Sequence, residues 1–293
     1  MKDFILTVFF ALVIGFGAMA QIYTLKDDDV VVENGIIKSC SYDFQLKNII
    51  IPQTLDGQTI IGIYDGWYSN AGIFNDKGIT SVVLPATLKK IGDYAFGNNK
   101  LTSLDLSVCT NLDTIGASAF SSNSLGVIDL SSCPLISLID NSAFYHNSIA
   151  SIDLSNCTVL KNISSSAFSN NKLTSIDLSD CISLTNIGDH AFYSNQLTNV
   201  NLNACTKLLS IGKEAFYANW SLTGFELPEI TYNSTVYKTW NDGNANSYIA
   251  GTDQATDLNT FYLPFIPYTL KDDDVIVENG IIKSCSYDFQ LKN

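Results

Sequence analysis

Apolar residues recur in register through five consecutive 24-residue units, 101–124, 125–148, 149–172, 173–196 and 197–220, and residues 79–100 form a shorter copy. Each unit begins with Leu-x-x-Leu-x-Leu or a close variant, and each has an Ala-Phe pair four residues before its end. The local alternation of the first segment predicts a short β-strand. One unit cannot bury such a face alone, so the units must stack. The pattern therefore predicts a solenoid whose strands pair in parallel, about 4.8 Å apart.

Two polar columns are as regular as the apolar ones. An Asn follows each Phe by three residues, and we predict that it hydrogen-bonds the backbone of its own turn and of the neighbouring turn. A Cys recurs between the strand segment and the next apolar position. Parallel Cβ vectors on neighbouring strands suit disulfides poorly, so we predict free, buried thiols. The two columns are Asn99, Asn123, Asn147, Asn171, Asn195 and Asn219, and Cys109, Cys133, Cys157, Cys181 and Cys205.

The motif Leu-x-x-Leu-x-Leu-x-x-Cys-x-x-Leu resembles the leucine-rich-repeat signature, and Ile-Gly-x-x-Ala-Phe-x-x-Asn is similar to BspA-type repeats of bacterial secreted and surface proteins. The resemblance covers 49–228. It departs from the commonest pattern because Asn replaces Cys after Ala-Phe, and Leu-Ser replaces Leu-Pro in most units. The resemblance implies a mainly β leucine-rich-repeat solenoid with one short parallel strand per repeat, turns or short 3-10 or helical segments between strands, and β-hairpin caps.

The flanking segments divide the chain further. Lys2, an apolar run from Phe4 to Phe16 and the Ala18-Met19-Ala20 site predict a signal peptide, hence an exported protein, extracellular or on the cell surface. An Asn-Gly turn between Val- and Ile-rich runs predicts an N-terminal hairpin. The expected divisions are 1–20 signal peptide, 21–48 N-terminal β cap, 49–228 solenoid, 229–266 β-rich C-terminal cap, and 267–293 the truncated start of a second module.

The last segment repeats the N-terminal cap almost without change. Residues 268–293 differ from 23–48 only where Ile276 replaces Val31. A segment that copies a cap is a candidate for occupying the cap position of another molecule. We therefore expect that any self-association runs weakly, head to tail, through 268–293.

Charge and composition exclude several classes of function. The net charge is −13 and every basic residue is Lys, which makes nucleic acid and anionic membranes poor partners. The sequence contains no second long apolar stretch, so we predict no transmembrane span. His146 and His190 lie in different columns without a nucleophile motif, and Cys-x-x-Cys spacing is absent. We predict no catalytic residues, no metal ligands and no cofactor.

One polar column on the strands is the candidate ligand-binding site. Its members lie between two inward-facing apolar positions, so they must point outward, and parallel pairing would stack them into an acidic line. Neighbouring carboxylates about 5 Å apart in water repel by less than about 1 kcal/mol, so the line needs no metal, although calcium is one alternative. A basic partner fits its sign. The predicted ligand-binding residues are Asp105, Asp129, Asp153, Asp177 and Asn201.

The function that follows is a non-catalytic adhesion module that binds an extracellular protein of the host or of a neighbouring cell, as the resemblance implies. A structural spacer in a tandem-repeat surface protein is the first alternative. A glycan-binding module is the second, and it requires aromatic side chains on an exposed face. Such side chains follow the ladder Phe in some units, where they either form a second adhesive edge or pack over the turn; they are Tyr145, Tyr193, Tyr217 and Trp220.

Overall fold

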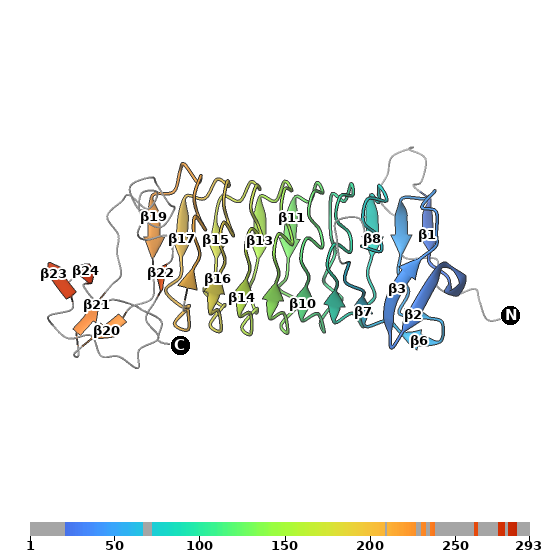
Figure 1. The fold of residues 1–293 in the computed structure, drawn as a ribbon, viewed down its shortest axis with the longest axis horizontal. Helices are drawn as coiled ribbons and strands as arrows, with labels where there is room; N and C mark the ends of the chain where they lie inside the picture. The colour runs from blue at the N-terminus through green and yellow to red at the C-terminus, as the bar shows by residue number, and fades with distance from the viewer. Residues whose placement is uncertain are drawn as a thin grey trace.

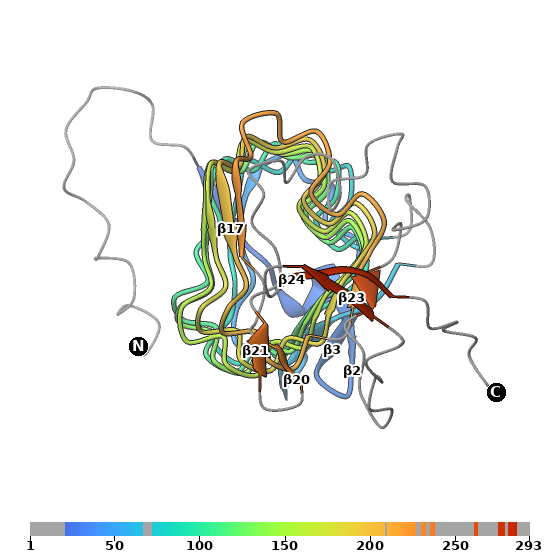
Figure 2. The ribbon, with the colours of Figure 1, turned by 90° about the vertical axis from the view of Figure 1, so that its left-hand side faces the viewer.

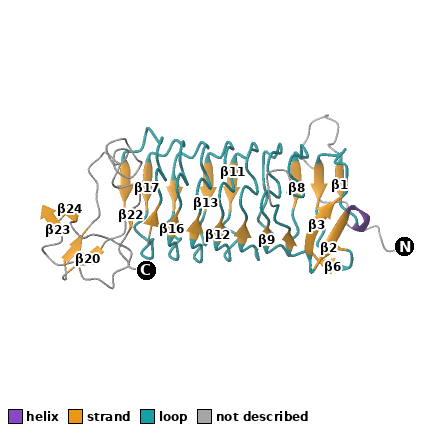
Figure 3. Cartoon of the chain, viewed as in Figure 1, coloured by secondary structure: helices purple, strands orange, loops and turns teal. Residues whose placement is uncertain are grey.

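The computed structural model is a mainly β solenoid of about seven coils stacked in one row, which confirms the predicted fold class (Figure 1). The structure describes residues 21–66, 72–208 and 210–226, and the strand segments 230–232, 235–237, 261–262, 275–278 and 281–285. The predicted signal peptide lies outside the described residues. The one helix in the described part of the chain is the 3-10 turn η1 (Asp27–Asp29), and turns and short strands make up each coil (Figure 3).

The Leu-x-x-Leu-x-Leu segments form a first strip of parallel strands, as predicted. Their inward residues pair in register along the row, for example Ile128 with Ile152 and Ile176 with Val200. The strip is divided into three groups, and 101–106 contains no strand. The groups are β1 (Ile22–Thr24), β4 (Asn48–Ile50) and β8 (Ser81–Val83); β11 (Val127–Asp129) and β13 (Ser151–Asp153); and β15 (Ile176–Asp177), β17 (Asn199–Asn201) and β19 (Gly224–Glu226).

A second strand in each coil was not predicted, and it builds the longest sheet of the molecule. Pairs such as Thr114–Ile115 and Leu138–Ile139 align in parallel along the whole row. This ten-stranded sheet contains, in order, β2 (Val30–Glu33), β3 (Ile36–Cys40), β7 (Gly62–Ile63), β9 (Lys90–Ile91), β10 (Thr114–Ile115), β12 (Leu138–Ile139), β14 (Asn162–Ile163), β16 (Asn186–Ile187), β18 (Ser210–Ile211) and β22 (Phe261–Tyr262).

The Ala-Phe turns form the third side of the coil, visible when the row is viewed along its axis (Figure 2). Here alternate N–H groups donate to the next coil: those of Tyr94, Phe96 and Asn98 bond the carbonyls 23 residues later, at 2.7, 2.7 and 2.8 Å. The residues two before and two after each ladder Phe from Phe96 to Phe216 adopt left-handed φ angles of 53–58°. Backbone hydrogen bonds therefore join neighbouring coils on all three sides.

The core is a set of side-chain ladders, of which the phenylalanine ladder is the largest. Consecutive rings from Phe74 to Phe216 stack with centroids 5.1–5.6 Å apart and planes within 9° of parallel. All of these rings are fully buried. Tyr23, Tyr42 and Phe44 extend the aromatic row into the N-terminal segment. Offset aromatic stacking adds stabilisation beyond the burial of apolar area.

The asparagine ladder makes the predicted hydrogen bonds in every coil. Asn171 is representative: its Nδ2 donates to the carbonyl of Phe168 in its own coil, at 3.1 Å, and to that of Phe144 in the preceding coil, at 2.9 Å. Its Oδ1 accepts the N–H of Ile149 at 3.0 Å. Each Asn thus provides hydrogen-bond partners for backbone groups of two neighbouring coils. These groups lie in the turns, outside both strips of strands.

The cysteine column consists of free, buried thiols, as predicted. Several Sγ atoms point to a carbonyl of the preceding coil; the Sγ of Cys157 lies 3.5 Å from the oxygen of Leu130. Burial raises the pKa of Cys109 to about 11 and the pKa of Cys133, Cys157 and Cys205 to about 12. A buried neutral thiol is a small apolar residue here.

The ends of the ten-stranded sheet are covered by antiparallel elements. At the N-terminal end the β2–β3 hairpin turns at Asn34 and Gly35, both with positive φ, and β3 pairs with β7. At the other end β22 pairs with β18. Three further antiparallel hairpins lie outside this sheet: β5 (Thr54–Leu55) with β6 (Gln58–Thr59), β20 (Ile230–Tyr232) with β21 (Thr235–Tyr237), and β23 (Val275–Glu278) with β24 (Ile281–Cys285).

Candidate binding surface

The outward residues of the first strip contain the predicted acidic line. Asp129 pairs in register with Asp153, and Asp177 pairs with Asn201. Asp105 belongs to the same column of the repeat but lies in the coil without a strand. All five side chains are exposed. The structure therefore brings four of the five predicted residues together as two pairs, separated where the strip is divided between β13 and β15, and leaves Asp105 unpaired with another strand.

Each member of the line also closes the turn that follows its strand. The Asp129 Oδ1 accepts the N–H of Ser131 at 2.9 Å and its hydroxyl at 2.6 Å. In each of the other three acids, Oδ1 likewise accepts the backbone N–H of the residue two positions later. Asn201 makes the same bond: its Oδ1 accepts the N–H of Asn203 at 2.9 Å. The turns make these bonds with either Asp or Asn, so they need the side-chain oxygen and not the charge.

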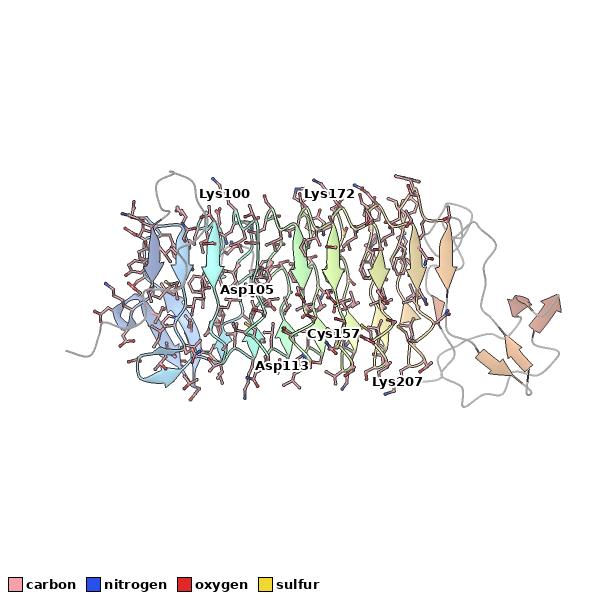
Figure 4. The ribbon with its side chains drawn as sticks, turned by 180° about the vertical axis from the view of Figure 1, so that it is seen from behind. Lys100, Asp105, Asp113, Cys157, Lys172 and Lys207 are labelled. Carbon is pink, nitrogen blue, oxygen red and sulfur yellow. The ribbon has the colours of Figure 1, made fainter. Side chains whose placement is uncertain are left out.

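Serine hydrogen bonds favour the charged form of two carboxylates of the line, Asp105 and Asp153. Hydrogen bonds from Ser107 lower the pKa of Asp105, and those from Ser155 lower the pKa of Asp153. No ion pair neutralises the line within the described residues, where lysines pair instead with Asp65 and Glu214. Figure 4 places Lys100 and Lys172 along one edge of the row and Asp113 and Lys207 along the other, with Asp105 between them.

A hollow of about 410 Å³ lies on the strip between β13 and β15. Its exposed apolar side chain is that of Val127, which is 57% exposed; the lining residues Ile152 and Leu154 face the core, where Ile152 is partly buried and Leu154 is buried. Its acidic lining comes from Asp129, Asp153, Asp177 and Asp180, and its remaining members are Ser151, Ser155 and Ser179. The hollow therefore combines the aliphatic side chain of Val127 with four carboxylates. This combination matches the aliphatic stem and cationic head of a lysine or arginine side chain.

Two contributors to the hollow were not predicted from sequence. Asp180 immediately precedes a ladder Cys, a position that is Val, Ser, Asn or Ala in the other 24-residue units. Its Oδ2 accepts the N–H of Asn156 at 3.2 Å, which connects two neighbouring coils. Val127 occupies a column that is otherwise small or polar. Neither residue type recurs at the same position in the other repeats, so the repeat pattern could not identify these two residues as part of a binding surface.

The remaining candidates for chemistry stay apart. His146 is exposed on a turn, and His190 lies 3.0 Å from Glu214 in the next coil, measured from Nε2 to Oε2. Within the described ranges, no three His, Cys, Asp or Glu side chains are arranged to hold a metal ion. In the same part of the chain no helix has the length and apolarity needed to cross a membrane.

Comparison with known proteins assigns the chain to a family of repeat proteins. The family model described as the BspA type leucine rich repeat region, with six copies, matches residues 68–182 and 137–241. No curated protein matches the chain.

Three solved structures are similar at low identity. A leucine rich cell surface protein from Faecalibacterium prausnitzii A2-165 is 20% identical over 75% of this chain, with a TM-score of 0.40. The functional domain of InlJ from Listeria monocytogenes, which includes a cysteine ladder, is 18% identical over 70%, with a TM-score of 0.36. A leucine-rich repeat protein from Bacteroides ovatus ATCC 8483 is 18% identical over 70%, with a TM-score of 0.34. The chain spans 56%, 53% and 68% of their respective lengths.

Proposed function

Because the chain belongs to the BspA-type leucine-rich-repeat family, we propose that it is an exported, non-catalytic module that binds a protein through the acidic strip of its first strand face. The partner is an extracellular protein of a host or of a neighbouring cell. The observation that carries the proposal is the hollow over β11, β13 and β15, which is lined by four carboxylates and by the exposed side chain of Val127. A surface lysine or arginine of the partner would fill it.

The charge of the strip supports this assignment. Asp129, Asp153 and Asp177 are exposed, and no lysine of the described residues pairs with them. Complementary charge across an interface speeds association and selects the partner, and its effect weakens as salt screens the charges. The binding should therefore tighten at low ionic strength. A purely structural spacer, the alternative function, has no such requirement for an acidic strip.

The decisive variant removes charge and keeps the fold. In the triple variant Asp129→Asn, Asp153→Asn and Asp177→Asn, the amide oxygen still accepts the N–H two residues along, as Asn201 does. The matched control, Asp28→Asn, Asp56→Asn and Asp113→Asn, removes three exposed charges elsewhere. Binding of the full chain to a panel of extracellular-matrix proteins is measured by surface plasmon resonance at low and physiological salt.

We expect saturable binding to at least one matrix protein, weakened about tenfold or more in the strip variant and unchanged in the control variant. Equal binding by wild type and strip variant would refute the acidic strip as the site. Absence of binding across the panel would favour the spacer function.

A further inference from the structure

A second surface, on the Ala-Phe turns of the last coils, has a different chemistry from the acidic strip. The side chains form one connected cluster across neighbouring coils. His190 packs edge-on against Tyr193 at 5.5 Å between ring centroids, and Tyr193 contacts Tyr217 at 5.8 Å. Tyr217 in turn contacts Trp220 at 5.7 Å, with ring planes 68° apart. We call these residues, with Lys213 and Glu214, the aromatic edge.

The fold does not require these aromatic residues. The position of Tyr193 and Tyr217 is Tyr145 in one other coil and Gly97, Ser121 and Ser169 in three more. The position of Trp220 is Lys or Ser in four other coils and Gln in the fifth, and the Trp220 side chain is 75% exposed. Coils with small side chains at these places keep the same ladders and the same backbone hydrogen bonds. Packing over the turn therefore does not explain why large aromatic rings cluster at this edge.

Polar groups line the same edge and are already oriented. The Glu214 carboxylate is held by His190, 3.0 Å from Oε2, and by Lys213, 3.7 Å from Oε1. About a quarter of the Glu214 side chain remains exposed, with a relative exposure of 26%. Both His190 and Glu214 replace serines that occupy the equivalent left-handed position in three other coils. Acceptor and donor groups thus lie beside the rings.

We propose that the aromatic edge is a carbohydrate-binding site for a neutral glycan. The apolar face of a sugar ring stacks on the exposed Trp220 and the half-buried Tyr217 beside it, and its hydroxyls bond the carboxylate, the imidazole and the ammonium group, which together both accept and donate. The positive charge of Lys213 offsets the negative charge of Glu214, so the aromatic edge lacks the net negative charge that would attract a basic protein. An uncharged, hydroxyl-rich ligand fits this balance better than the partner of the acidic strip does.

The test uses the full chain with cellohexaose, chitohexaose and a mannose hexasaccharide as probes, measured by isothermal titration calorimetry. Trp220→Ser and Tyr217→Ser introduce residues that other coils carry at those positions, so both variants should fold, which circular dichroism checks. The matched control is Tyr145→Ser, which removes a Tyr of the same column away from the edge. The strip variant Asp129→Asn, Asp153→Asn and Asp177→Asn separates the two surfaces.

We expect at least one hexasaccharide to bind saturably, with affinity lowered about tenfold or more by Trp220→Ser and by Tyr217→Ser. The Tyr145→Ser and strip variants should bind the sugar like the wild type. No saturable binding to any of the three sugars would overturn the proposal, and so would binding that Trp220→Ser leaves unchanged. Loss of matrix-protein binding in Trp220→Ser without sugar binding would overturn it as well, by assigning the edge to a protein partner.

Discussion

At the scale of single residues, the solenoid repeats side chains whose interactions run from one coil to the next. Asn171 bonds backbone groups of two coils, and Phe144 stacks between Phe120 and Phe168. Such a residue stabilises an interface between neighbours as well as its own turn. The same holds for the thiols, which add a response to pH that the amide and phenyl ladders lack.

The thiol ladder predicts a loss of stability in alkali. Burial raises the folded-state pKa of Cys133 and Cys157 to about 12, from an ordinary value of 9.0. Between these values the unfolded chain releases protons that the folded chain keeps, so the free energy of unfolding falls as pH rises. Urea unfolding at about pH 7 and about pH 10.5 should show this fall.

The control is the double variant Cys133→Ala and Cys157→Ala. It loses apolar contacts at neutral pH, but its stability should decline less steeply above about pH 9 because two of the titrating groups are gone. An unchanged pH dependence would show that other groups, such as tyrosines of the unfolded chain, cause the alkaline loss.

Side chains that repeat could be predicted from the sequence, and those that occur once could not. The Asn column recurs in six successive coils and the Cys column in five, so their period identified them as inward-facing and their chemistry then specified their bonds. Asp180 and Val127 break the period, and they line the hollow together with the predicted acids. The acidic line was located, but its turn-closing bonds were not foreseen, because the i to i+2 geometry appears only once the turn is known.

At the scale of elements, the first strand could be predicted in all of the 24-residue coils except the one that begins at 101, where the predicted strand is absent, and the second strand could not be predicted. Leu-x-x-Leu-x-Leu alternates over six residues, whereas Thr114–Ile115 has only two residues between turns. Two residues carry too little periodicity to distinguish a strand from a turn. The second strands form because the chain must run back to the start of the next coil. Stacking of the coils then pairs each second strand with its copy in the neighbouring coil.

The N-terminal hairpin offers a test of how tightly an element is fitted to the row. Gly35 has φ +75°, and a Cβ there would lie 2.5 Å from the carbonyl oxygen of Thr59. Gly57 has a similar φ, +66°, with open space around it. Gly57→Ala should therefore cost only the left-handed strain, about 1–2 kcal/mol, while Gly35→Ala should cost clearly more because backbone must also move.

Urea unfolding of the two variants makes the comparison, since both lose the same conformational freedom. Equal destabilisation would mean that the hairpin shifts at no cost and that the Thr59 contact does not constrain it. A larger effect at Gly35 would show that the β2–β3 hairpin is held in a defined position next to β7.

At the scale of the whole molecule, each coil contacts chiefly its neighbours, so stability should be the sum of coils and interfaces. Deleting 149–172 removes one complete unit and brings Phe144 next to Phe192 with every ladder in register. We expect this shortened chain to fold, with a smaller denaturant m-value than the full chain because less surface is buried. Circular dichroism and urea titration measure both.

The matched control deletes half a unit, residues 149–160. This deletion places strand segments opposite turns and removes a Cys without its Phe, so cooperative unfolding should be lost. If both deletions fold equally well, the register of the ladders does not specify the stack. The domain boundaries proposed from the sequence, including those around 229–266 and 267–293, remain predictions at this scale.

The direction of the hydrogen bonds between coils has a mechanical consequence. All three sides of the solenoid are joined by bonds that lie along its axis. Tension applied between the two ends would pull these bonds lengthwise and would load every interface equally, but a terminal coil is held by one neighbour only and would be released first. Coils would detach in sequence from an end, each releasing 24 residues, or about 80 Å of extended chain. A protein built in this way would dissipate force in small, repeated steps and keep its remaining coils, with their surfaces, intact.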